Sequence, residues 1–203
     1  MRKTFLILVL FLNMTTHLLA QSGEPEVING YTLPPEPDER TNNATILGID
    51  FNSNGIRDDV ERYIIKRFST AEFPKTKTAI ALQYVWANQK MLESPVIESK
   101  KHINDAIDCQ FFWFDQKQIE INQRIIDLSK TDFKASIIET IKAGQWEDEY
   151  MVINDDDIND IVYNTRERIE RDFQFNQACS GHIFQGRTRS LQNCQVNILE
   201  LGE

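Results

Sequence analysis

A stretch that begins at Asp50 and ends at Glu61 constrains this chain most, because oxygen-bearing side chains recur in it at a fixed spacing. They stand at positions 1, 3, 5, 9 and 12, and Gly55 stands at position 6. Calcium is a hard cation that takes six to eight oxygen ligands at about 2.3–2.6 Å, and a loop with this spacing supplies them. The glycine allows the sharp reversal that turns alternate side chains towards one point. The sequence therefore predicts a calcium-binding loop that leads into a helix.

The predicted ligands are five side chains and one backbone carbonyl group: Asp50, Asn52, Asn54, Ile56 (carbonyl), Asp58 and Glu61. We expect Glu61 to close the site with both carboxylate oxygens. The alternative is a turn rich in Asn and Gly, with the acids of the following helix favoured by the helix dipole alone. Extracellular calcium modules usually have dissociation constants of about 10⁻⁴–10⁻³ M. At millimolar calcium such a site stabilises a protein by about 1 kcal/mol, which suits a structural role.

The first residues are typical of a secretory signal peptide. Arg2 and Lys3 precede an apolar run over residues 4–12, and a small residue comes before the polar stretch that starts at residue 21. The run is shorter than the roughly 20 apolar residues of a membrane-spanning helix. We therefore expect residues 1–20 to be a signal peptide, the mature protein to be periplasmic or secreted, and no segment to span a membrane. A buried N-terminal helix is the alternative.

The charge balance limits the class of partner. The chain carries 22 basic and 31 acidic residues, a formal net charge of -9. An acidic surface repels phosphate backbones, so we expect no nucleic-acid partner. Calcium ions and basic proteins are better suited to such a surface.

The three cysteines, Cys109, Cys179 and Cys194, predict one disulfide and one free thiol in an oxidising compartment. A bridge from Cys194 to either of the others would attach the C-terminal tail to the body. We favour Cys109–Cys194, which closes the longer loop, but the spacing alone does not fix the pairing.

The chain divides into an N-terminal extended part and a helical part. Residues 21–45 hold four of the six prolines among acidic and amide residues, which predicts an extended linker. Residues 46–203 are expected to form one helical domain with the calcium loop at its N-terminus. Strand signals are scarce, so the predicted fold is all-α, a single multi-helix bundle.

Apolar residues at spacings of three and four predict the helices. After the loop, a stripe of this kind runs along Ile56, Val60, Tyr63, Ile64 and Phe68. Further helices are expected over residues 78–92, 119–128 and 133–141, and Thr131 is expected to cap the last of these, which should end near Gly144. Ser94 and Pro95 are expected to open another helix, whose inward residues are Ile103, Ile107, Phe111 and Phe114. A final helix is expected from Asn164 to about Gly181.

Two charged clusters leave alternatives open. The acids of residues 155–160 could be a second cation site or an acid–base pair, but they have no glycine for a turn, and we interpret them as a solvated helix start. The C-terminal arginines could pair with acids of this chain or bind an acidic protein or polysaccharide: Arg166, Arg168, Arg171, Arg187 and Arg189.

Residues 33–63 include Leu-Pro-Pro-Glu-Pro-Asp and Asn-Gly-Ile-Arg-Asp-Asp-Val-Glu-Arg-Tyr. With these motifs the chain resembles a group of uncharacterised exported proteins of marine and other Gram-negative bacteria, and the loop is similar to those of EF-hands, dockerins and thrombospondin type 3 repeats. The resemblance implies calcium at the six positions given above and implies no activity. Two departures, Arg57 in place of the apolar residue at position 8 and the lack of a second loop, favour a structural site over a calcium sensor.

From these features we expect an exported, calcium-binding helical module that is non-enzymatic and has a binding or assembly role, with a protein or polysaccharide partner. The alternative is a secreted hydrolase that uses Asp or Glu and holds calcium as a structural ion. A third possibility is an inhibitor that blocks a basic partner with its acidic face.

Overall fold

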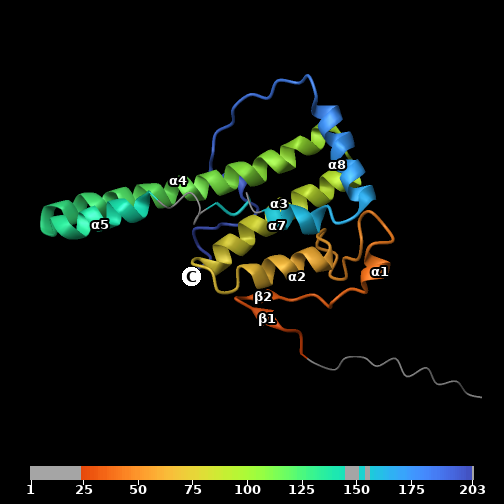
Figure 1. The fold of residues 1–203 in the computed structure, drawn as a ribbon, viewed down its shortest axis with the longest axis horizontal. Coiled ribbons are helices and arrows are strands. Elements are labelled where there is room, and N and C mark those ends of the chain that lie inside the picture. Colours follow the sequence, from red (N-terminus) through yellow and green to blue (C-terminus); the bar gives the residue numbers. More distant parts are fainter. Residues whose placement is uncertain (1–23, 145–150, 154–155, 203) are drawn as a thin grey trace, which may run out of the picture.

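In the computed structural model, residues 24–144, 151–153 and 156–202 are described, and most of them are helical (Figure 1). The all-α prediction is confirmed, since the described strands form a single pair. The predicted signal peptide, residues 1–20, lies outside the described residues. Within the described ranges, no helix combines the length and the apolar character that a membrane span requires.

The predicted extended linker contains regular structure, which corrects the expectation. Strands β1 (Val27–Ile28) and β2 (Tyr31–Thr32) form an antiparallel hairpin, and a short helix, α1 (Glu39–Asn42), follows. The hairpin turn is Asn29-Gly30, and both residues have positive φ angles, 51° and 86°. Asn-Gly is the preferred pair for such two-residue turns, so this signal was present in the sequence and was missed.

Helix α3 (Pro74–Glu93) is the centre of the body. It packs against α2 (Asp58–Arg67), α4 (Lys100–Thr131) and α8 (Arg166–Cys179). Because neighbours cover it on several sides, polar as well as apolar residues of α3 are buried. Along α2 and the residues beside its two ends, the predicted stripe is confirmed for Ile56, Val60, Ile64 and Phe68, which are all buried in the same core.

The start of α4 differs from the prediction. Ser94 ends α3, and a 3₁₀ turn, η1 (Ile97–Ser99), leads into α4, so Ser94 and Pro95 are not the cap and first turn of a helix. Helix α4 then continues without a break through residues 119–128, which were expected to be separate. Its most buried side chains are not the predicted ones but a neighbouring stripe: Ala106, Cys109, Gln110 and Trp113. The predicted Ile103, Ile107, Phe111 and Phe114 are partly buried.

Helix α5 (Phe133–Ala143) folds back on the end of α4, and the two project from the body as an arm (Figure 1). Asp132, not Thr131, caps α5, because its side chain accepts a hydrogen bond from the N–H of Ala135 at 3.0 Å. The helix ends at Ala143, beside the predicted stop at Gly144.

Two helices complete the described chain. Helix α7 (Asp156–Val162) begins in the acidic cluster, as the helix-start interpretation expects for its described residues. Helix α8 begins one residue later than predicted, since Thr165 is its cap, and ends just before Gly181.

Cys109 and Cys194 form a disulfide that attaches the C-terminal tail to α4. The tail includes a short turn, η2 (Leu191–Asn193), which packs against α4, and Cys179 is a free thiol. The favoured pairing is confirmed.

Candidate metal centre

The predicted calcium loop is a tight turn held by its own side chains. The carboxylate of Asp50 accepts hydrogen bonds from two backbone N–H groups of the loop, that of Asn54 at 3.1 Å and that of Gly55 at 2.8 Å. Gly55 has a φ of 84°, and a Cβ atom at this position would lie 3.0 Å from Nε1 of Trp86. Both the turn and the close approach of the loop to α3 therefore require glycine.

Asp58 joins the loop to the first turn of α2. Its N–H donates to the carbonyl group of Ile49 at 2.8 Å, and its carboxylate accepts from the N–H of Phe51 at 3.1 and 3.2 Å. Asp58 is 1% exposed, so this carboxylate is almost fully removed from water. Its place at the N-terminus of α2 gives it some compensation from the helix dipole.

Glu61 lies one turn further along α2 and faces the loop. It is 6% exposed, and its two carboxylate oxygens accept hydrogen bonds from the side-chain amides of Asn52 at 3.0 Å and Asn54 at 2.9 Å. Within the described part of the chain, neither Glu61 nor Asp58 nor Asp50 forms an ion pair. A buried carboxylate is thus held by two neutral amides, although a buried charge is normally paired with an opposite charge or a metal ion.

The pKa values of Glu61 and Asp58 show how unfavourable the charges of these two carboxylates are in this structure. Burial raises the pKa of Glu61, and the charges of Asp58 and Asp50 raise it further, against the hydrogen bonds from Asn52 and Asn54. Burial also raises the pKa of Asp58, with added repulsion from Asp50 and Asp59. A divalent cation between these carboxylates would remove both effects, because it would replace repulsion with attraction.

The structure brings the predicted ligands together in one loop: Asp50, Asn52, Asn54, Ile56, Asp58 and Glu61. The side chain of Ile56 is buried in the core, which fixes the position of its backbone carbonyl group, the one predicted ligand that is not a side chain. Among the described residues, no three His, Cys, Asp or Glu side chains form a ready-made metal site. The Asn oxygens would have to complete the ligand set, and in this structure they accept the backbone N–H groups of Asn54 and Ile56. The donor set, all oxygen with three acids, fits calcium.

Two buried arginines, whose role was not predicted from sequence, anchor the loop to the C-terminal helices. Arg57 is fully buried, pairs with Asp59 at 2.5 Å, and donates to the carbonyl groups of Ile161 at 2.5 Å and Val162 at 3.3 Å, at the end of α7. These are carbonyl groups that a helix end leaves without a partner. Gly48 makes room for Arg57, since a Cβ atom there would lie 2.3 Å from its Cδ.

Arg168 of α8 holds the chain that enters the loop. Its guanidinium group donates to the carbonyl groups of Asn42 at 2.9 Å, Thr45 at 3.1 Å and Ile46 at 3.0 Å, and to the side chains of Asn43 at 2.9 Å and Asn164. Burial, together with the nearby charge of Arg57, lowers the pKa of Arg168 to about 10. Arg168 therefore holds the segment before the loop, and Arg57 holds the loop itself.

The other C-terminal arginines mostly pair with acids of this chain. Arg187 pairs with Asp105 and Asp108, Arg189 with Asp115, and Arg166 with Glu170. The prediction of intramolecular partners is thus supported for these three, and Arg168 is used as described above.

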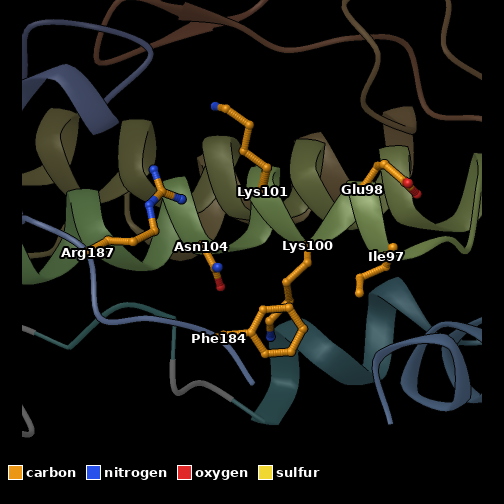
Figure 2. A pocket seen from close by; sticks show the side chains of 7 residues that line it. All are labelled: Ile97, Glu98, Lys100, Lys101, Asn104, Phe184 and Arg187. Carbon is orange, nitrogen blue, oxygen red and sulfur yellow. The ribbon is translucent and has the colours of Figure 1, made fainter. Parts of the chain in front are cut away.

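A hollow of about 460 Å³ lies where Arg187 and Phe184 meet the start of α4 (Figure 2). Its basic groups do not converge on one point. Lys101 extends to one side of α4 and Lys100 to the other, where its ammonium lies 5.5 Å from the centre of the Phe184 ring. Arg187 is already paired with acids. This arrangement gives little support to the alternative in which the C-terminal arginines bind an acidic protein or polysaccharide.

Comparisons of the chain with models of protein families, with curated proteins and with solved structures gave no match. The resemblance to exported calcium-loop proteins therefore stays a prediction, and the loop is interpreted from its own residues.

Proposed function

We propose that the protein is an exported, calcium-binding helical module with a binding or assembly role and no catalytic one. The observation that carries this proposal is Glu61, a buried carboxylate with a raised pKa that faces Asn52 and Asn54 across the loop. A structure that removes a carboxylate from water without a charged partner destabilises itself, unless a cation binds there. The ligand spacing and the all-oxygen donor set favour calcium.

The contacts around the loop support a structural role for the ion. Arg57 connects the loop to the end of α7, and Arg168 of α8 holds the segment that precedes the loop. Each arginine is about half of the chain away from its partners, so an ordered loop holds together the N-terminal segment and the C-terminal helices. A calcium ion that rigidifies the loop would stabilise these long-range contacts.

The runner-up, a secreted hydrolase that uses Asp or Glu, needs two acids that converge in a cavity. The acids with raised pKa values and partial burial do not support such a pair. Asp58 and Glu61 face the loop, where N–H groups occupy their oxygens, and Asp172 lies on α8 with its carboxylate bonded to Asn176 at 3.0 Å. The binding role is therefore the better supported of the two.

Thermal unfolding of the mature protein in EGTA and in 10 mM calcium tests the proposal. With a dissociation constant of about 10⁻⁴–10⁻³ M, calcium at this concentration adds about 1.4–2.7 kcal/mol. For a chain of this size we expect the melting temperature to rise by about 3–10 °C. The Glu61→Gln variant should lose this rise, and Glu93→Gln, which removes an exposed acid that pairs with Lys90, should keep it. The same small shift in all three proteins would refute a calcium site in the loop.

A further inference from the structure

A cavity of about 620 Å³ lies between the N-terminal hairpin segment and the calcium loop. Leu33, Pro34 and Pro35 provide an apolar wall, and Phe51, the second residue of the loop, lines it as well. Phe51 is 74% exposed, so its ring is accessible to a ligand in the cavity. The volume falls within the usual range of about 300–1,000 Å³ for ligand sites.

The charges at this cavity favour a cationic ligand. Three glutamates line it, Glu24, Glu26 and Glu36, against one cation, Arg62. Arg62 is already committed to the chain, because its guanidinium pairs with Glu36 at 2.5 Å and donates to the carbonyl group of Pro34. Glu24 and Glu26 are exposed. They therefore provide two negative charges at the edge of an apolar hollow.

From these two features, the apolar wall and the acidic edge, we infer that the cavity binds a basic peptide segment of a partner protein. An apolar side chain would lie against Phe51 and Leu33, and a neighbouring lysine or arginine would pair with Glu24 or Glu26. The inference names the partner of the proposed binding role and rests on that role. It does not require calcium, although Phe51 and Asn52 belong to both the cavity and the loop.

Fluorescence anisotropy with a labelled peptide, Lys-Leu-Lys-Phe-Lys, tests this inference, with Glu-Leu-Glu-Phe-Glu as the peptide of opposite charge. We expect Phe51→Ala to weaken binding of the basic peptide at least tenfold and Glu26→Gln at least threefold. Phe173→Ala is the matched control, since this phenylalanine is 76% exposed on α8, away from the cavity. It should bind as the unmodified protein does.

Several outcomes would overturn the inference. They are equal binding by all variants, binding of the acidic peptide or of neutral maltoheptaose in place of the basic one, and no binding at millimolar peptide. The titrations are run both in 10 mM calcium and in EGTA, beside the melting temperatures. Failure of the peptide site and failure of the calcium site are therefore seen separately.

Discussion

Replacing Arg168 with methionine should cost this protein much of its stability. The side chain is fully buried and donates to five oxygen atoms of Asn42, Asn43, Thr45, Ile46 and Asn164. Methionine fills a similar length but donates nothing. Five lost hydrogen bonds at about 0.5–1.5 kcal/mol each would lower the free energy of unfolding by about 2.5–7.5 kcal/mol. Thr45 is an exposed residue, so water can replace part of what is lost there, and we expect about 3–5 kcal/mol in total, as for other buried polar partners.

Urea unfolding followed by circular dichroism measures this effect. A loss of about 3–5 kcal/mol lowers the midpoint by roughly 1–5 M, given typical slopes of about 1–3 kcal/mol per M. Arg171→Met is the control, because it removes the same charge from the same helix at a half-buried position. A midpoint that falls equally in both variants would refute the argument, since the effect would then come from the charge of α8 and not from the contacts of Arg168.

Four further predictions concern the loop, the segment before it and the tail. In EGTA, stability should rise as pH falls from 7 towards 5, because the raised pKa values of Asp58 and Glu61 make the folded chain bind protons more readily than the unfolded one, whose values are near 3.8 and 4.5; urea midpoints should show this rise, and it should shrink in Glu61→Gln. Calcium should stabilise less over the same pH range, since protons compete for the same oxygens, as melting temperatures can show. Cys194→Ser opens a loop of 85 residues between Cys109 and Cys194 and should cost about 2–5 kcal/mol by urea unfolding, with an unchanged midpoint as the contrary result. Gly48→Ala should cost about 2–4 kcal/mol in the same assay, because its φ is 67° and its Cβ would overlap Arg57.

The helices could be predicted from sequence wherever one face of a helix is apolar. The stripe of Ile56, Val60, Ile64 and Phe68, which runs along α2 and just past its two ends, faces the core, so periodicity alone locates the helix and its buried side. On α4 the same method selected the wrong stripe. The buried Gln110 is polar, but its side-chain oxygen accepts the N–H groups of Val152 at 2.7 Å and Ile153 at 2.5 Å. A hydrophobic pattern does not predict the burial of a polar residue whose hydrogen-bond partners come from a distant segment.

The N-terminal segment shows a different limit. Its prolines predict an extended chain correctly between the elements, but Asn29-Gly30 forms a hairpin turn that composition does not reveal. Packing then adds what no local signal contains. Leu33 is buried, and Asn29 donates to the carbonyl group of Ser69 at 2.8 Å, so this segment is part of the body and not a free linker.

Arg57 shows why the loop could be located from sequence while its setting could not. At position 8 the sequence offers a charged residue where paired calcium loops have an apolar one, which by itself indicates only that no second loop is bound there. The structure gives the physical reason: the guanidinium is buried against the carbonyl groups of Ile161 and Val162, which are more than one hundred residues away along the chain. A helix end carries partial negative charge and unpaired carbonyl groups, both of which an arginine satisfies. The C-terminal end of α7 thus supports the loop through Arg57, so this single loop is held by a helix end and needs no partner of its own kind.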